Sequence, residues 1–392
     1  MNHRFTKLTA LAAVGALALT GCGSNNDDNG SSSPSATASQ TASSTPEATQ
    51  SETADTTAQV SGVDYKPTCP GGDISGAGSS AQANAINKVI SDYKKACSGA
   101  TVNYSVTGSG AGIQSFIGNQ VDWAGSDSVL KKDKGEVDKA KARCGGNDPW
   151  HLPMAAGPIA VVFNLDGVKD LTLSSETLAR IMVGDITKWD DEAIKKENSG
   201  VNLPSAPITV FFRSDESGTT DNFTKYLNKA AGDVWTEEHS KSWKGAGKGA
   251  DKSAGVAQAV KSTPNSISYV EWSYATKNDL STAALDNGNG PVKLTGESAG
   301  KAVSAAKVAG SGNDLQLDLQ YKGTPAGVYP AVLVTYEIVC SKYSDSAKTK
   351  LLQDFMAFYA SKGEQQEIQS LGYAPLPGDV AKKVVDAARA IS

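Results

Sequence analysis

Apolar positions follow two alternating patterns along most of the chain. Short apolar runs bounded by glycine or serine alternate with longer segments in which apolar residues return every three or four positions. This alternation predicts an α/β architecture with mainly parallel sheets. The short runs predict strands at residues 73–76, 101–106, 122–125, 157–165, 208–213, 266–270 and 331–340. The longer segments predict helices at residues 81–96, 112–119, 131–143, 174–182, 221–231, 253–262 and 347–362, and residues 286–290 predict a hairpin turn.

Three Gly- and Ser-rich loops each join a predicted strand to a predicted helix. They are residues 75–81 (SGAGSSA), 107–112 (TGSGAG) and 213–220 (RSDESGTT). Amides at a helix start have no partner within the helix, and the helix dipole adds partial positive charge, so such loops favour anions. One loop of this kind is an ordinary helix cap. Three of them, one carrying Arg213, predict a site in which several helix ends hold a small oxyanion.

The first 22 residues predict an export signal. Arg4 and Lys7 precede an apolar run at residues 8–19 that is too short to span a bilayer. The sequence Leu-Thr-Gly-Cys at residues 19–22 resembles the bacterial lipoprotein signal, which implies that a lipid on Cys22 attaches the chain to the membrane. An ordinary signal peptide with a chance cysteine is the alternative.

Residues 23–62 predict a disordered Ser- and Thr-rich tether, because they hold five acidic residues but no aromatic or basic residue. These acids account for most of the formal net charge of −5, so the rest of the chain is nearly neutral. The lysines of residues 131–143 alternate with acids, as on a solvated helix face. Such a charge distribution argues against nucleic-acid binding.

The remaining length of about 330 residues exceeds what one hydrophobic core usually holds, so we expect two lobes. We assign residues 63–157 and 320–392 to lobe 1, which is discontinuous, and residues 158–319 to lobe 2. In doubly wound sheets, ligands collect at the carboxyl ends of the strands. The three loops lie at such ends, so we expect them to face each other across a cleft.

Four cysteines remain after Cys22. An even number in an exported chain predicts two disulfides, with three possible connectivities. The preferred pairing is Cys69 with Cys97 and Cys144 with Cys340, because Cys69 precedes the first strand and Cys97 follows the helix that returns to that strand's start. The chain has no Cys-x-x-Cys pair and only three histidines, so we expect no metal site and no cofactor.

Several further segments resemble the extracytoplasmic phosphate-binding proteins that supply Pst-type phosphate ABC transporters. The resemblance covers nearly all of residues 72–385 and includes residues 102–104 (VNY), 122–127 (DWAGSD), 187–194 (TKWDDEAI), 267–271 (ISYVE) and 371–377 (LGYAPLP). It implies a two-lobed, type II periplasmic-binding-protein-like fold with two hinge strands and a ligand cleft. It also implies inorganic phosphate and membrane permease subunits as partners, and we expect a monomer.

The same resemblance implies a set of phosphate-binding residues. Carried over by motif, they are Ser79, Ser80, Ala81, Ser109, Asp127, Arg213, Ser217, Gly218 and Thr219, with Asp215 bracing the arginine. An ionised carboxylate only accepts hydrogen bonds, so Asp127 would favour a ligand that keeps a proton, such as phosphate, over sulfate.

Two positions depart from the family pattern. Ser80 stands where the family often has threonine, which leaves a hydroxyl in place. Glu216 stands where the family has a small glycine, and its carboxylate would weaken anion binding unless it points to solvent.

Three other functions fit parts of the sequence. A binding protein for sulfate or molybdate would use the same loops, but Asp127 and Arg213 argue against it. A phosphate-ester hydrolase is disfavoured because neither His151 nor His239 lies in a recognisable triad context, so we do not expect an enzyme. A structural lipoprotein would need only the tether and the anchor, and would leave the three loops unexplained.

Overall fold

The computed structural model describes residues 61–392, so the predicted signal peptide, Cys22 and nearly all of the predicted tether lie outside the described residues. Within them, the strands are β1 (Gly72–Gly78), β2 (Ala100–Val106), β3 (Trp123–Ser126), β4 (Pro149–Asn164), β5 (Thr172–Ser174), β6 (Thr209–Arg213), β7 (Lys248–Ala250), β8 (Ser266–Glu271), β9 (Ser281–Thr282), β10 (Ala284–Asp286), β11 (Pro291–Val292), β12 (Lys307–Val308), β13 (Leu317–Asp318) and β14 (Val332–Cys340).

The helices of the same residues alternate with these strands. They are α1 (Ala83–Ala96), α2 (Ser109–Ile117), α3 (Glu136–Arg143), α4 (Ser175–Val183), α5 (Glu192–Glu197), α6 (Gly218–Ala230), α7 (Lys252–Ser262), α8 (Trp272–Lys277), α9 (Gly296–Ser304), α10 (Ser346–Tyr359), α11 (Lys362–Gln369) and α12 (Gly378–Ala390). The α/β class predicted from the sequence is therefore confirmed.

The main sheet has the strand order β2-β1-β3-β14-β4-β8-β6-β7, and β9 pairs with β4 beside this path. The pairs β1–β2, β1–β3, β6–β8 and β6–β7 are parallel. The pairs β3–β14, β14–β4 and β4–β8 in the middle are antiparallel. The expectation of mainly parallel sheets is correct for the two ends of the sheet and wrong for its centre.

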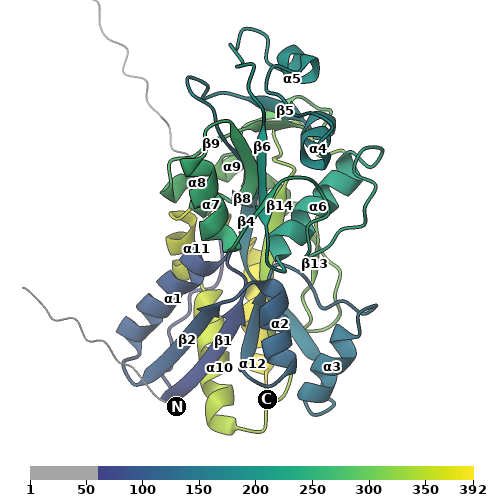
Figure 1. Ribbon diagram of the computed structural model, residues 1–392. Helices are drawn as coiled ribbons and strands as arrows, with labels where there is room; N and C mark the ends of the chain where they lie inside the picture. The colour runs from purple at the N-terminus through teal and green to yellow at the C-terminus, as the bar shows by residue number, and fades with distance from the viewer. Residues whose placement is uncertain (1–60) are drawn as a thin grey trace, which may run out of the picture. The chain divides into compact units, whose positions relative to one another are not determined.

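The long strand β4 explains this antiparallel centre. Its residues 149–158 pair with β14, and its residues 159–164 pair with β8. Figure 1 shows β1 and β2 in the lower half of the body and β6 and β8 in the upper half, with β4 passing between them. Strand β4 takes the chain from the β1–β3 group to the β6–β8 group, and β14 brings it back. The two strands therefore run in opposite directions.

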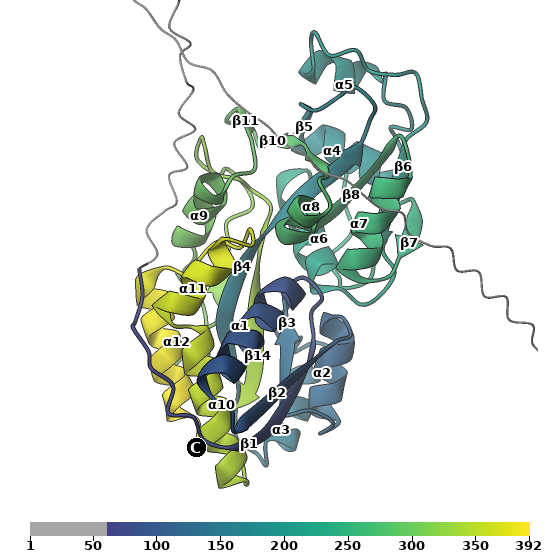
Figure 2. The same cartoon turned by 90° about the vertical axis from the view of Figure 1, so that its left-hand side faces the viewer.

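The C-terminal part of the chain returns to the lower half. Figure 2 shows α11 and α12 beside β4, on the side away from α2. Helix α10 packs against both β1 and α12. The chain therefore contributes to the lower half twice, once before β4 and once from β14 onward.

Aromatic side chains form the core at both ends of the sheet. Tyr93 meets Phe355 edge-on with ring centroids 5.4 Å apart, and Trp123 is completely buried nearby. At the other end, Phe223 stacks on Tyr269 with centroids 4.3 Å apart. This packing fixes β1–β3 and β6–β8, and hence the loops that leave their carboxyl ends.

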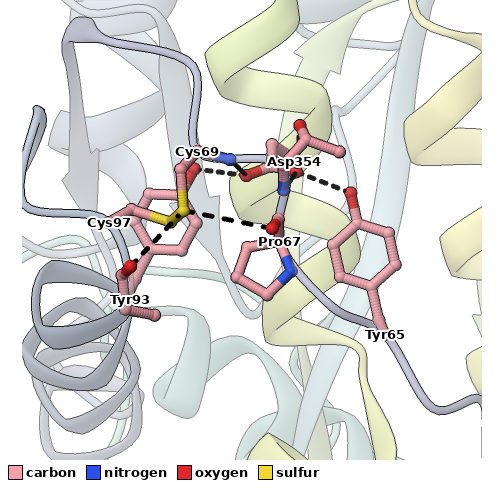
Figure 3. Close-up of a disulfide and its surroundings, with 8 residues drawn as sticks. Tyr65, Pro67, Cys69, Tyr93, Cys97 and Asp354 are labelled. Carbon is pink, nitrogen blue, oxygen red and sulfur yellow. Dashed lines mark hydrogen bonds between the residues drawn. A yellow bond between two sulfur atoms is a disulfide. The ribbon is translucent and has the colours of Figure 1, made fainter.

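Both predicted disulfides are present. Cys69 is bonded to Cys97 and Cys144 to Cys340, with Cα–Cα distances of 4.9 and 5.4 Å. Figure 3 shows the first disulfide beside Asp354, whose carboxylate accepts hydrogen bonds from the hydroxyls of Tyr65 and Tyr93. This bond and Asp354 together hold the segment that precedes β1 against α1 and α10.

Among the described residues, the helices are all too short or too polar to cross a membrane.

Candidate anion-binding site

The three Gly- and Ser-rich loops meet at one place in the structure. The amides of Thr107 and Gly108 in the second loop donate to the carbonyl oxygen of Gly78 in the first, at 3.0 and 2.8 Å. The amide of Gly110 donates to the carbonyl oxygen of Glu216 in the third loop, at 2.9 Å. The second loop therefore contacts both of the others.

The start of α6 lies directly against the second loop and the end of β3. A Cβ atom added to Gly218 would lie 2.6 Å from Ser109 Oγ and 2.7 Å from Asp127 Cβ, so only glycine fits. Ser217 caps the helix, because its hydroxyl accepts a hydrogen bond from the amide of Thr220 at 3.1 Å. The positive end of the α6 dipole is thus held beside Asp127.

Asp127 lies at the centre of these contacts and is only 3% exposed. Its Oδ1 accepts hydrogen bonds from the hydroxyls of Ser79 and Thr335, both at 2.7 Å. Among residues 61–392, its Oδ2 has only the hydroxyls of Ser109 and Thr219 as partners, each at 3.5 Å. Because hydrogen bonds of this length are weak, Oδ2 is the oxygen with room for another donor.

Electrostatic effects of opposite sign act on Asp127. Burial raises the pKa of its carboxyl group, while hydrogen bonds from Ser79 and Thr335 and the charge of Arg213 lower it. The net direction is upward. A buried carboxyl group with a raised pKa is suited to sharing a proton with a ligand.

Arg213 is buried at the end of β6 and is 3% exposed. Its Nε and Nη2 donate to the two carboxylate oxygens of Asp215, at 2.7 and 2.5 Å, in a bidentate pair. Its Nη1 donates to Ser253 Oγ at 3.2 Å. Burial acts to raise the pKa of Asp215, but the hydrogen bonds and charge of Arg213 outweigh burial and lower the pKa. Asp215 is thus paired with Arg213 in the structure.

Two tyrosines hold the first loop in place. The hydroxyl of Tyr274 donates to the carbonyl oxygen of Ser80 at 2.9 Å, and that of Tyr373 donates to the carbonyl oxygen of Ala81 at 2.6 Å. The amide of Ala81 donates to Ser79 Oγ at 3.1 Å. The hydroxyl of Ser79 is therefore engaged by Asp127 and Ala81, whereas the hydroxyl of Ser80 turns toward Ser253, at 2.9 Å.

The nine residues implied by the resemblance thus form one connected cluster, to which the structure adds two residues that sequence reasoning missed. Ser253 lies in the first turn of α7 and is completely buried, and Thr335 lies within β14 and is 1% exposed. Thr335 had one signal in the sequence, since it is a polar residue inside the apolar run 331–340. Ser253 had none, because a serine at a helix start is ordinary.

Glu216 lies beside the second loop. The residue is exposed, and its carboxylate lies against the backbone of Gly110, where a Cβ would come within 2.3 Å of Oε2. Within residues 61–392, no cluster of His, Cys, Asp or Glu has the arrangement of a metal site.

One segment outside the cluster matches a hydrolase motif. Residues 296–300 (GESAG) match the Gly-x-Ser-x-Gly pattern of hydrolase nucleophiles. The structure places Ser298 in the first turn of α9, where it forms a capping box with Thr295, and its hydroxyl also contacts the carbonyl oxygen of Lys293. Because this serine does not stand on a strand-to-helix turn, it lacks the geometry of a nucleophile elbow.

The cluster has the chemistry of an oxyanion site with one proton-accepting position. Hydroxyl groups, helix-start amides and one guanidinium supply donors, and Asp127 Oδ2 supplies an acceptor. Charge-assisted hydrogen bonds of this kind are each worth about 1.5–3 kcal/mol and offset the cost of burying an anion.

Comparison with known proteins places the chain in a family. A family model described as a PBP superfamily domain matches residues 32–362, which begins inside the predicted tether. The chain is 40% identical over 395 residues to phosphate-binding protein PstS 3 of Mycobacterium leprae, covering 100% of this chain and 99% of that protein. It is also 40% identical over 396 residues to PstS 3 of Mycobacterium tuberculosis strain H37Rv, with the same coverage.

A solved structure shares the fold. The high-affinity periplasmic phosphate-binding protein PfluDING, bound with phosphate, matches with a TM-score of 0.65 and 23% sequence identity, covering 79% of this chain and 92% of that one. This match supports the periplasmic-binding-protein-like fold implied by the resemblance. With relatives 40% identical over its whole length, the chain belongs to the PstS family of phosphate-binding proteins.

Proposed function

We propose that this protein binds inorganic phosphate outside the cytoplasm and delivers it to the permease of an ABC transporter for import. The single observation that carries this proposal is the asymmetry of Asp127. In the described part of the chain, Oδ1 accepts two short hydrogen bonds, while Oδ2 accepts only long ones, and the positive charge of Arg213 acts on the same carboxyl group. The names of the PstS relatives support the same ligand.

The proposed ligand fits the donors and the acceptor. Monohydrogen or dihydrogen phosphate would donate a hydrogen bond from its protonated oxygen to Asp127 Oδ2. Its other oxygens would accept hydrogen bonds from Ser80, Ser109, Thr219 and the start of α6. Sulfate has no proton at neutral pH, so one of its oxygens would face an unpaired carboxylate. At a ceiling of about −1.5 kcal/mol per heavy atom, a five-atom ligand could reach about −7.5 kcal/mol, which is near micromolar affinity.

Capture and release would depend on movement of the two halves. We place the first lobe at residues 63–157 and 320–392 and the second at residues 158–319, with β4 and β14 as the hinge strands. Ser79, Ser80, Ser109 and Asp127 come from the first lobe, and the loop that carries Arg213 comes from the second. Closure would bring both sets of donors around the ligand and exclude water.

A lipid on Cys22 would keep the receptor near its permease, with residues 23–62 as the tether. Replacement of Cys22 by serine should release the protein from the membrane fraction into the medium without changing phosphate affinity. Membrane retention of the Cys22→Ser variant would contradict lipid anchoring and leave the binding site untouched.

Calorimetric titration tests the binding site itself. Arg213→Ala should lower phosphate affinity more than tenfold, because a buried charge-assisted pair contributes at least about 1.5 kcal/mol. Arg389→Ala is the matched control, since Arg389 is an exposed arginine in the last turn of α12. Equal affinities of the two variants would remove Arg213 from the site.

A further inference from the structure

Ser253, in the first turn of α7, contacts both Ser80 of the first loop and Arg213 of the third. Its amide donates to Ser80 Oγ at 3.1 Å, and the two hydroxyl oxygens are 2.9 Å apart. Its own hydroxyl also accepts a hydrogen bond from Arg213 Nη1 at 3.2 Å. Ser253 is completely buried and Ser80 is 1% exposed, so these contacts are shielded from bulk water.

The hydroxyl groups of Ser80 and Ser253 carry two protons between them. Each of the two hydroxyl oxygens already accepts one N–H, Ser80 from the amide of Ser253 and Ser253 from Arg213. The single contact between the two hydroxyls uses one of their two protons. The other proton has no acceptor among the contacts of the described residues, and a buried hydroxyl proton without an acceptor costs free energy.

The direction of that contact follows from the neighbouring charge. The guanidinium of Arg213 polarises the Ser253 hydroxyl and makes it a better donor, which favours a chain of hydrogen bonds from Arg213 through Ser253 to Ser80. Both acceptor positions of Ser80 Oγ are then filled. The remaining proton belongs to Ser80, and it can be satisfied only by an acceptor outside this chain.

We propose that Ser253 is a positioning residue that fixes the Ser80 hydroxyl as an obligatory donor to an unprotonated oxygen of the bound oxyanion. This inference rests on the proposed phosphate site and deepens it. The ligand proton is excluded from the Ser80 position and is directed to Asp127 Oδ2. Ser80 and Asp127 therefore orient a nearly symmetric ligand together. Ser80 donates a hydrogen bond to an unprotonated ligand oxygen, and Asp127 accepts one from the protonated oxygen.

A double-mutant cycle separates this role from simple packing. Phosphate affinity is measured by calorimetry for the wild type, Ser253→Ala, Ser80→Ala and the double variant. Ser253→Ala should weaken binding about tenfold when Ser80 is present and less than about twofold when Ser80 is absent, because Ser253 acts through Ser80. Equal losses in both backgrounds, or no loss in either, would overturn the proposal.

The pH dependence gives a second readout that packing alone would not move. Without Ser253, the Ser80 hydroxyl can rotate and accept a ligand proton. The loss of phosphate affinity in Ser253→Ala should therefore depend on pH. It should be larger in alkaline buffer, where the ligand is the monohydrogen dianion, than in acid buffer, where the ligand is the dihydrogen anion. A loss that is the same at both pH values would contradict the proposed orientation.

Ser175→Ala is the matched control. Ser175 is likewise a buried serine in the first turn of a helix, and its hydroxyl contacts Tyr226 at 3.0 Å rather than the site. If Ser253→Ala does not fold, Ser253→Cys retains the side-chain size with a weak donor and should show the same loss. Failure of the wild type to bind phosphate would overturn the proposed function, whereas binding that is indifferent to Ser253 would overturn only this inference.

Discussion

At the scale of single residues, the two oxygens of Asp127 have unequal surroundings, and this inequality governs ligand choice. Asp127→Asn replaces one of the two carboxylate oxygens with an amide nitrogen, which can donate to an unprotonated ligand oxygen. We therefore expect weaker phosphate binding and weaker discrimination against sulfate, measured by parallel titrations of both anions. Asp170→Asn on an exposed loop is the control. Unchanged phosphate affinity together with continued rejection of sulfate would exclude Asp127 from the site.

Sequence reasoning reached the residues of the cluster that stand in a local motif. Arg213 and Asp215 share one loop, and Asp127 closely follows the strand predicted at residues 122–125, so their types and spacing carry the information. Ser253 and Thr335 were missed because their roles arise only from long-range contacts, Ser253 with Ser80 and Thr335 with Asp127. An isolated serine or threonine contains no signal for a partner that distant in the chain.

At the scale of elements, a buried ion pair holds the beginning of α3. Lys241 Nζ lies 2.8 Å from Glu136 Oε1, and the two side chains are 2% and 7% exposed. The carbonyl oxygen of Lys241 also accepts the amide of Ser217, the cap of α6. The pair therefore links α3 to the loop that begins α6.

Removing one partner of this pair leaves a buried charge. Lys241→Met should lower the free energy of unfolding by about 3–5 kcal/mol, as measured by urea denaturation. Adding Glu136→Gln to the same chain should restore part of the loss, because the remaining group is then neutral. A Lys241→Met variant as stable as the wild type would show that the pair has no structural role.

Strand β14 carries a second buried group whose effect depends on pH. Glu337 is completely buried, and within residues 61–392 neither carboxylate oxygen has a partner of good hydrogen-bond geometry, although Gln82 and Trp123 lie near enough to act on its pKa in the lowering direction. Burial, with a further contribution from the charge of Asp127, raises its pKa from 4.5 to about 8. The folded protein therefore holds this proton over a pH range in which the unfolded chain releases it.

The sign of the resulting pH effect is fixed. Between pH 4.5 and about 8, the unfolded chain binds fewer protons, so the free energy of unfolding should fall as pH rises, by about 1.4 kcal/mol per pH unit for this group. Glu337→Gln stays neutral and should lose this part of the slope, so its advantage over the wild type grows from acid to alkaline pH. If urea denaturation gave the same dependence of the free energy of unfolding on pH for the wild type and for Glu337→Gln, the pH effect would not come from Glu337.

Element boundaries were less predictable than element types. The predicted strand at residues 157–165 is only the second half of β4, since Pro149 and Pro153 obscure the first half. That half forms because β14 pairs with it, with a register shift between Thr335 and Tyr336 opposite Pro153. Helix α6 begins at Gly218 rather than at residue 221, so the Gly-Thr part of the third loop is already helical.

At the scale of the whole molecule, the two disulfides close chain loops of very different length. Cys69–Cys97 spans 28 residues and Cys144–Cys340 spans 196. Loop-closure entropy predicts a loss of about 4 kcal/mol for removing the first and about 5 kcal/mol for removing the second. Thermal unfolding of the Cys69→Ser/Cys97→Ser and Cys144→Ser/Cys340→Ser variants checks this order. If the Cys69→Ser/Cys97→Ser variant unfolded at the lower temperature, local packing around Asp354 would contribute more to stability than chain entropy does.

The central claim is that three helix-start loops, Arg213 and Asp127 form a site for a protonated tetrahedral oxyanion. The most direct measurement is calorimetric titration of the protein, freed of resident ligand, with phosphate and then with sulfate at the same neutral pH. We expect one phosphate per chain with micromolar or tighter affinity and no measurable sulfate binding. Equal binding of the two anions, or no heat from phosphate, would contradict it.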